Sequence, residues 1–184
     1  MKAASLATAV LLAIACLVAA ATARGSNVTV SATVAGGSTL SVAALNTPSF
    51  NLTLNGDDQT ATYQAQVQVV DARGLATGGG WNLTITSTQF HDSSTHTFPA
   101  SASTISSVSA GCHSGSTCAL PTNSVSNSNL AVPISPTTAK FLNAASGTGL
   151  GRIDVTANVG VAVPANTIAA TYTSTLTVAI AAGP

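Results

Sequence analysis

The sequence predicts an all-β fold: a single antiparallel β-sandwich of the immunoglobulin-like or Greek-key type, with a long Ser/Thr-rich loop. Apolar and polar residues alternate with period 2 along most of the chain, and no helix-length window has helical apolar spacing. Only 5% of the residues are charged, against about 25% in an ordinary soluble domain. Ala, Thr, Ser, Val, Asn and Gly dominate instead, which favours strands and turns. Each candidate strand has one apolar and one Thr/Ser/Asn face, as in a two-layer sandwich.

The first residues have the organisation of a secretory signal peptide. Lys2 supplies a positive charge, residues 6–20 form an apolar run, and Ala21-Thr22-Ala23 is a small-x-small cleavage site. We therefore expect a signal peptide at residues 1–23 and one mature domain at residues 24–184. An uncleaved membrane anchor is the alternative, but the small-residue exit and the lack of flanking charges favour cleavage. The mature form is then expected to be secreted and to have no membrane span.

The three cysteines have different expected roles. Cys16 ends an Ala-Ile-Ala-Cys segment inside the apolar run, and the segment lacks the Leu that usually lies three residues before a lipidated Cys. Cys112 and Cys118 predict a disulfide that closes a short loop of an exported protein. A zinc site would need both of these, His113 and a fourth ligand, and the sequence has no second Cys/His cluster. No metal and no cofactor is expected.

The strands are expected in a definite order along the chain. The candidate strands are residues 28–30, 50–54, 63–69, 81–85, 130–134, 153–163 and 172–180. The last two are the longest, and Pro164 and Asn166 between them predict an antiparallel hairpin. Alternation fails between about Gln89 and Asn129, where a long, partly ordered loop around the cysteine pair is expected to be a place for variable function.

Two pairs of motifs are the most specific features of the sequence. The first pair is Val70-Asp71-Ala72-Arg73-Gly74 with Gly78-Gly79-Gly80-Trp81-Asn82-Leu83-Thr84, and the second is Val163-Pro164-Ala165-Asn166-Thr167 with Thr171-Tyr172-Thr173-Ser174-Thr175-Leu176-Thr177. In this order, behind a signal peptide, they resemble the WxL domain of Gram-positive surface proteins over roughly residues 28–184. The resemblance implies a secreted protein of the cell surface or cell wall, bound noncovalently through peptidoglycan, without enzymatic activity.

One departure from the family pattern concerns the second Trp-x-Leu. It normally follows the Tyr-Thr-x-Thr-Leu-Thr motif, and here it is Val178-Ala179-Ile180, without the aromatic residue. The chain is then either a divergent member or one with weakened wall affinity. The resemblance makes Trp81 and Leu83 the first candidates for wall binding, with Val178 and Ile180 as the second half of the motif.

The residues of the first motif can also be interpreted from their own chemistry, without the family resemblance. Trp81 and Leu83 share one face of a strand, either filling the core or, for Trp81, stacking on a sugar ring. Gly78, Gly79 and Gly80 before them predict a bulge or tight turn that needs positive φ.

Two further features have a structural and a functional interpretation. Asp71 and Arg73 lie two residues apart, so they are expected to pair with each other or to anchor the Gly-rich turn; Arg73 could instead bind a carboxylate or phosphate of the wall. Tyr172 is expected to bury its ring and to hydrogen-bond a neighbouring connection through its hydroxyl, as in a tyrosine corner.

Several function classes are disfavoured. With no Glu and a formal net charge of +0, the chain has no basic patch for nucleic acid. His91 and Asp92 are adjacent and would face opposite sides of a strand, His96 lies in the same loop, and no Ser lies in a nucleophile context, so catalysis is not expected. A row of outward Thr at residues 171–177 is too short to predict ice binding.

The expected partner is peptidoglycan or another surface glycan, and other surface proteins are further candidates. A structural or pilus-like subunit that assembles through edge-strand pairing is the alternative function, because the chain is Thr-rich, strand-rich and low in charge.

Overall fold

The computed structural model describes residues 29–77 and 79–184 of the chain. The predicted signal peptide lies outside the described residues. The chain divides into two units, Met1–Thr33 and Val34–Pro184, and every strand in the described residues belongs to the second. The strands are β1 (Leu40–Ala44), β2 (Gln59–Asp71), β3 (Trp81–Ser87), β4 (Ser103–Cys112), β5 (Leu130–Ala131), β6 (Ala139–Ala144), β7 (Gly151–Val163) and β8 (Leu176–Ala182).

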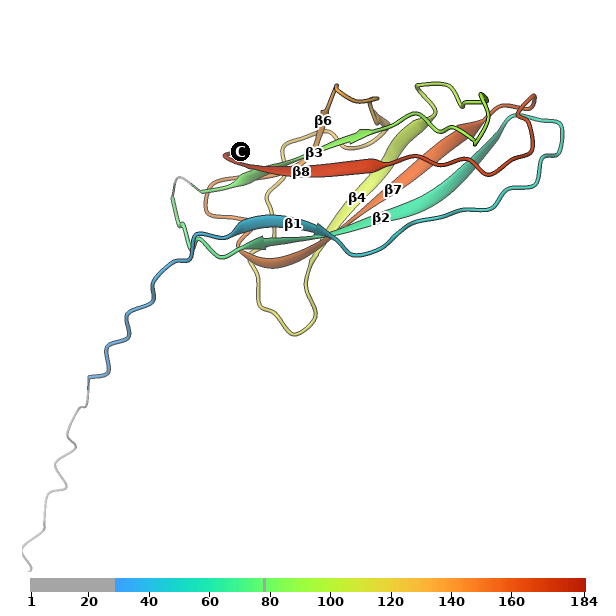
Figure 1. The fold of residues 1–184 in the computed structure, drawn as a ribbon. Coiled ribbons are helices and arrows are strands. Elements are labelled where there is room, and N and C mark those ends of the chain that lie inside the picture. Colours follow the sequence, from blue (N-terminus) through green and yellow to red (C-terminus); the bar gives the residue numbers. More distant parts are fainter. Residues whose placement is uncertain (1–28, 78) are drawn as a thin grey trace, which may run out of the picture. The chain divides into compact units, whose positions relative to one another are not determined.

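The strands form two antiparallel sheets. One sheet has five strands in the order β1-β2-β7-β4-β5, and the other has three in the order β6-β3-β8. Figure 1 shows them as two layers, with β3 and β8 in one and β2, β7 and β4 in the other. The described residues contain no helix, so the all-β prediction and the sandwich are confirmed.

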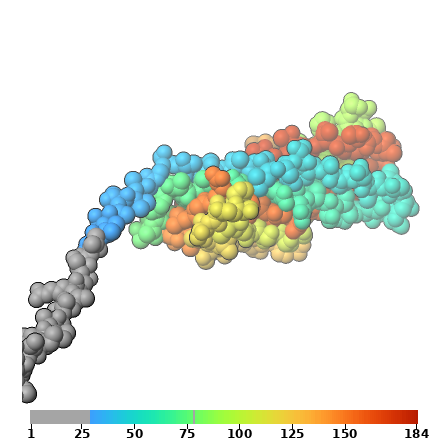
Figure 2. Space-filling view, turned by 90° about the horizontal axis from the view of Figure 1, so that it is seen from below, coloured from blue at the N-terminus to red at the C-terminus, as the bar shows by residue number. Residues whose placement is uncertain are grey.

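The longest ladder joins β2 and β7. It runs without interruption from the pair Gln59 and Val163 to the pair Asp71 and Gly151. Alternate residues of β7 are buried, which is the period-2 pattern that the Val-x-Val spacing predicts for a strand with one face on a core. The connection between β1 and β2, light blue in Figure 2, lies alongside the teal β2 strand.

The core lies between the two sheets. From β3 it receives Trp81, Leu83 and Ile85, each at most 1% exposed. They pack in one cluster with apolar residues of the five-stranded sheet and with Phe141 of β6. Full burial of one such aliphatic side chain stabilises the fold by about 1.5–3 kcal/mol. The cluster therefore fixes how the strands that carry the sequence motifs are placed.

The predicted hairpin between the last two strands is wrong. β7 and β8 lie in different sheets, because β2 and β4 occupy both edges of β7. The chain turns after Pro164, where the Thr167 amide donates to the Pro164 carbonyl over 3.0 Å and the Ala165 amide donates to Asp58 over 2.8 Å. It then crosses to the other layer, where β8 pairs with β3.

The long loop predicted between Gln89 and Asn129 is also corrected. Its middle is β4, which lies in the five-stranded sheet between β7 and β5. A register shift between Ile105 and Ser107 breaks the alternation, and most of the remaining positions are Ser or small residues. Both features hide the strand from a hydrophobicity pattern. The flanking segments 89–102 and 113–129 are largely without regular strands.

The other strand predictions have mixed outcomes. Residues 63–69 and 81–85 lie within β2 and β3, whereas residues 130–134 contribute only the two residues of β5. Residues 50–54 are not a strand, and neither are Thr29 and Val30; Val28 lies outside the described residues. The short strands β1 and β6 were not predicted, since β6 buries four consecutive residues and shows no alternation.

Candidate binding groove

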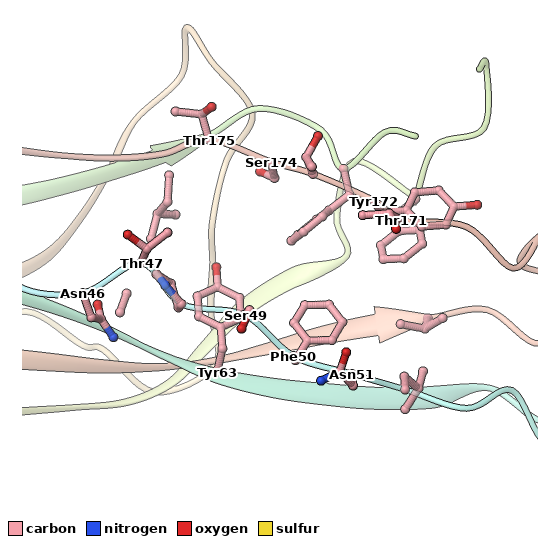
Figure 3. Close-up of a pocket in the computed structure, with 18 of the residues that line it drawn as sticks. Asn46, Thr47, Ser49, Phe50, Asn51, Tyr63, Thr171, Tyr172, Ser174 and Thr175 are labelled. Atoms are coloured by element: carbon pink, nitrogen blue, oxygen red, sulfur yellow. The ribbon is translucent and has the colours of Figure 1, made fainter. Parts of the chain in front are cut away.

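A groove lies at the side of the sandwich formed by the edge strands β1 and β8 and by the segments next to them. Its volume is about 1320 Å³. One bank is the segment 46–54, which follows β1, and the other is the segment 171–178, which leads into β8 (Figure 3). None of the lining residues in the described part of the chain is charged.

The first bank begins where the chain stops pairing with β2, after Leu45. The Leu45 amide still donates to the Gln66 carbonyl over 2.8 Å. The Asn46 side chain then replaces the backbone, donating to the Gln64 carbonyl over 2.8 Å and accepting from the Gln66 amide over 3.0 Å. Pro48 has no N–H with which to continue the ladder. The following residues run along the groove without joining a strand.

The second bank is an edge of the three-stranded sheet. Thr173 and His91 exchange backbone hydrogen bonds of 2.9 and 3.0 Å, so the backbone groups of Thr173 face the segment after β3. Alternate residues of an antiparallel strand direct their backbone N–H and C=O groups to opposite sides. The backbone groups of Tyr172 and Ser174 therefore point away from the segment after β3. The side chains of Thr171, Thr173, Thr175 and Thr177 are exposed, as the outward Thr row predicts.

Aromatic residues are concentrated in this groove. The chain has four Phe, two Tyr and one Trp, all within the described residues, and five of these seven line the groove. They form a continuous series of ring contacts: Phe50–Tyr63 at 6.2 Å between centroids, Phe50–Phe90 at 6.1 Å, Phe90–Phe98 at 5.4 Å and Phe98–Tyr172 at 4.3 Å. The groove is therefore both apolar and rich in hydroxyl groups.

The two tyrosines differ in how their hydroxyls are used. The Tyr172 hydroxyl donates to the Ile168 carbonyl over 3.0 Å while its ring packs on Phe98, close to the arrangement predicted from the sequence. The Tyr63 hydroxyl makes no hydrogen bond within residues 29–77 and 79–184, and Figure 3 shows Tyr63 between the banks. Burial raises the pKa of Tyr63 to about 12, so this hydroxyl is neutral at physiological pH.

The two halves of the sequence motif lie on neighbouring strands. Leu83 pairs with Ile180, and Ile85 pairs with Val178. Val178 and Ile180 are half-buried and pack against the core, and Val178 also lines the groove. Of these two strands only β8 lines the groove, and its ladder with β3 holds it in place.

Trp81 takes the core-filling role among its two predicted alternatives. Its side chain is 0% exposed, and its indole N–H donates to the Gly149 carbonyl over 2.9 Å. The fit is close: a Cβ on Gly149, which has φ of +70°, would lie 2.5 Å from the indole nitrogen. The ring is therefore not exposed for stacking on a sugar.

Asp71 and Arg73 pair with each other, as the sequence predicts. Arg73 donates to both carboxylate oxygens, over 2.9 and 2.7 Å, and its Nη2 also donates to the Gly80 carbonyl over 2.9 Å. Burial raises the pKa of Asp71, but the hydrogen bonds and charge of Arg73 outweigh burial and hold that pKa below its ordinary value. The pair therefore anchors the turn that leads into β3.

Gly80 is the residue that the predicted tight turn requires. Its φ is +105°, and a Cβ there would lie 2.6 Å from the Ala144 carbonyl oxygen. Gly79 lies against Leu75, and Gly78 lies outside the described residues.

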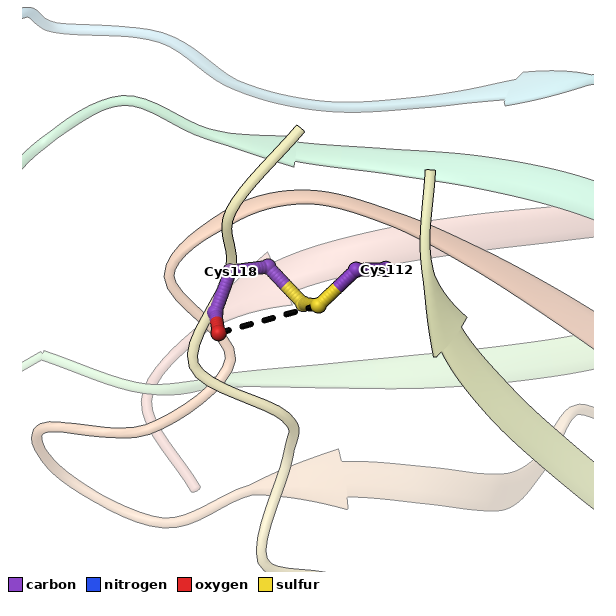
Figure 4. The surroundings of a disulfide bond; sticks show 2 residues. All are labelled: Cys112 and Cys118. Carbon is purple, nitrogen blue, oxygen red and sulfur yellow. Dashed lines mark hydrogen bonds between the residues drawn. A yellow bond between two sulfur atoms is a disulfide. The ribbon is translucent and has the colours of Figure 1, made fainter. Parts of the chain in front are cut away.

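The predicted disulfide between Cys112 and Cys118 is present (Figure 4). It links the end of β4 to the following loop, and Cys118 packs against the core cluster. The next residue, Ala119, exchanges backbone hydrogen bonds with Leu150 just before β7. The bond thus holds the loop against the five-stranded sheet.

Removing this disulfide should lower stability moderately. Because the closed loop is short, we expect Cys112→Ser with Cys118→Ser to reduce the free energy of unfolding by about 2 kcal/mol. Urea unfolding of the oxidised protein and of the double variant measures the difference. Identical unfolding midpoints would show that the loop is held by its other contacts alone.

His96 of the predicted loop pairs with Asp92. His96 Nδ1 lies 2.7 Å from an Asp92 carboxylate oxygen, and the other oxygen accepts from the Ser94 and His96 amides. These contacts close a turn. In the described ranges no three His, Cys, Asp or Glu side chains cluster in a way that would hold a metal ion. No helix found there is long and apolar enough to cross a membrane.

Fold and groove together define a β-sandwich binding domain. Its distinctive surface is an uncharged, aromatic groove between residues 46–54 and residues 171–178. The chain belongs to a family described as WxL domain, surface cell wall-binding, whose model matches residues 20–184. Comparison with curated proteins gives no match, and neither does comparison with solved structures. The family makes this a cell-surface domain that binds the cell wall.

Sequence reasoning missed most of the groove. Phe50, Tyr63, Phe90 and Phe98 were not among the candidate site residues, because each lies in a different segment of the chain. One usable signal was present in the sequence. Because the chain of 184 residues has only seven aromatic residues, each of them was a candidate for a core or binding role.

Proposed function

We propose that the domain binds peptidoglycan noncovalently and that the groove is its contact surface. The observation that carries this proposal is the gathering of five of the seven aromatic residues in one uncharged groove. We further propose that residues 1–23 are removed on export and that the mature domain acts by binding, without catalysis.

The chemistry of the groove suits a neutral glycan. A sugar ring has C–H faces that pack on aromatic rings, and its hydroxyl and N-acetyl groups exchange hydrogen bonds with side-chain hydroxyls and amides. Ser49, Asn51 and Ser174 supply such groups on the banks, and the Tyr63 hydroxyl supplies one between them. A phosphate-rich polymer would instead require Arg or Lys, which are absent from the lining residues in the described part of the chain.

In this proposal the motif residues act indirectly. Trp81 and Leu83 fix β3, β3 fixes β8, and β8 carries one bank of the groove. The missing second Trp changes a position that faces the core in this structure, where Val178 and Ile180 already fill the space. Wall binding is therefore expected despite the departure.

Substitutions in the groove should distinguish a loss of wall contact from a loss of folding. Tyr63→Phe removes one hydroxyl, and Phe50→Ala removes a half-buried ring from the first bank. We expect Phe50→Ala to weaken binding to purified peptidoglycan about tenfold or more, equivalent to ~1.4 kcal/mol, and Tyr63→Phe to have a smaller effect. A pull-down series over protein concentration measures the apparent Kd.

Thr62→Ala is the matched control, because Thr62 is the exposed neighbour of Tyr63 and does not line the groove. Its binding should equal that of the wild type. If Phe50→Ala and Tyr63→Phe, both shown by circular dichroism to be folded, bind as the wild type does, the groove is not the contact surface.

A further inference from the structure

A second hollow adjoins the groove where Phe98 and Tyr172 meet. Its volume is about 480 Å³, and it is lined by the segment after β3, the loop after β7 and Tyr172. The two cavities share four lining residues, which are Phe98, Thr167, Ile168 and Tyr172. The ring centroids of Phe98 and Tyr172 lie 4.3 Å apart, so this aromatic pair borders both cavities. A branch of a ligand that lies in the groove can therefore enter the hollow.

His96 distinguishes the hollow from the groove. Among the residues that line the two cavities in the described part of the chain, it is the only one whose side chain can carry a positive charge. Its side chain is 45% exposed, and Nδ1 lies 2.7 Å from an Asp92 carboxylate oxygen. Nε2 makes no hydrogen bond within residues 29–77 and 79–184. The fold thus holds one ring nitrogen and leaves the other available to a ligand.

The carboxylate of Asp92 is used within the turn. One oxygen accepts from the amides of Ser94 and His96, over 2.9 and 3.1 Å, and the other accepts from His96 Nδ1. The hydrogen bond from His96 is the largest cause that holds the pKa of Asp92 below its ordinary value. Because the ring is already anchored, a ligand that binds Nε2 immobilises little further side-chain freedom. The hollow therefore presents a fixed Nε2 and no free carboxylate among its described lining residues.

We propose that the hollow binds a carboxylate of the peptide that the wall glycan carries, through a hydrogen bond from His96 Nε2. This inference rests on the proposed function, and it names the second part of the polymer that the domain contacts. Peptidoglycan joins sugars to short peptides with free carboxylates. The sugars suit the uncharged groove, and an acidic branch suits the one lining side chain that can become positive. A hydrogen bond between a protonated imidazole and a carboxylate is charge-assisted.

This contact depends on pH. Because Nδ1 of His96 donates to Asp92, Nε2 carries a proton only in the protonated ring. Apart from Asp92, the ionisable group that faces the hollow from a neighbouring element is the Tyr172 hydroxyl, which donates to the Ile168 carbonyl. Asp58, which is bonded to the loop after β7, does not line the hollow. Imidazole side chains change charge between about pH 5 and pH 8, so the contact should be stronger at the acidic end of this range.

The test compares three soluble ligands by isothermal titration calorimetry on the purified mature chain. The first is peptidoglycan fragments with their peptides. The second is the same fragments after their carboxylates have been converted to amides, which removes the charge and keeps the size. The third is neutral oligomers of N-acetylglucosamine, which fit the groove proposal alone.

Two substitutions of equal size accompany the three ligands. His96→Asn keeps an amide nitrogen near the position of Nδ1, and so the contact with Asp92, but has no atom in place of Nε2. His91→Asn is the matched control, because His91 is exposed and lines neither cavity. Urea unfolding checks that both variants are as stable as the wild type.

At about pH 5.5 we expect the wild type to bind the untreated fragments about fivefold more tightly than the amidated ones, the order of one hydrogen bond, and this ratio to fall by about pH 8. His96→Asn should remove the preference without changing the affinity for the neutral oligomers, and His91→Asn should keep it. Equal affinity of the wild type for untreated and amidated fragments, or a preference that survives in His96→Asn, would overturn the inference and leave groove binding intact. Absence of binding to all three ligands would overturn the proposed function and this inference with it.

Discussion

Replacing Trp81 with alanine should lower the free energy of unfolding by about 3–5 kcal/mol, the largest effect expected of any single substitution in the core. The indole is fully buried between the sheets, and its N–H bonds the Gly149 carbonyl over 2.9 Å. Alanine would leave a cavity and an unpaired carbonyl oxygen. Urea unfolding followed by circular dichroism measures the loss, because the variant has no tryptophan to report by fluorescence.

Trp81→Phe is the control for this prediction. It keeps a large ring and loses the hydrogen bond, so its unfolding free energy should lie between those of the wild type and the alanine variant. Wall binding should fall in the alanine variant only to the extent that the protein unfolds. A fully stable Trp81→Ala protein that does not bind the wall would show instead that the indole touches the wall polymer.

Replacing Arg73 with alanine should destabilise the domain by about 3–5 kcal/mol, because it leaves the buried carboxylate of Asp71 without its charge partner. It also removes the hydrogen bond that joins this pair to the Gly80 carbonyl before β3. Arg152→Ala, at an exposed arginine of β7, serves as the matched control and should change stability by less than about 0.5 kcal/mol. Comparable losses in the two variants would refute a special role for the buried pair.

The same pair predicts a dependence on pH. The pKa of Asp71 in the folded chain lies below its ordinary value, so its contribution to stability is fully present above about pH 4 and is lost as pH falls through the folded pKa. Thermal unfolding between pH 2 and pH 7 should show this acid-side loss in the wild type. In the Arg73→Ala variant that part of the pH dependence should diminish.

Local patterns in the sequence predicted the parts of the fold in which one face is buried along a whole strand. The alternation in β2, β3 and β7 is complete, and the short spacing of Asp71 and Arg73 was enough to predict their pairing. The prediction missed β4 because a register shift between Ile105 and Ser107 breaks its period and four of its ten residues are serine. The alternation of apolar and polar residues therefore predicted strands only where the ladder of backbone hydrogen bonds is regular.

Long-range pairing could not be read from local spacing. A turn signal after β7 predicted a hairpin, yet the choice between pairing with β7 and crossing to β3 depends on which edges are already occupied. The groove has the same origin, since Phe50, Phe98 and Tyr172 meet only after the two sheets have closed. The family resemblance supplied the wall-binding role, whereas the surface proposed for it depends on tertiary structure.

The most direct test of the proposed wall contact is to titrate the isotope-labelled protein with soluble peptidoglycan fragments and to record its amide resonances. The account predicts saturable shifts at residues 46–54 and 171–178, the two banks of the groove, with little change in the disulfide loop at residues 112–118. Shifts confined to the disulfide loop or to the outer face of the five-stranded sheet would contradict it.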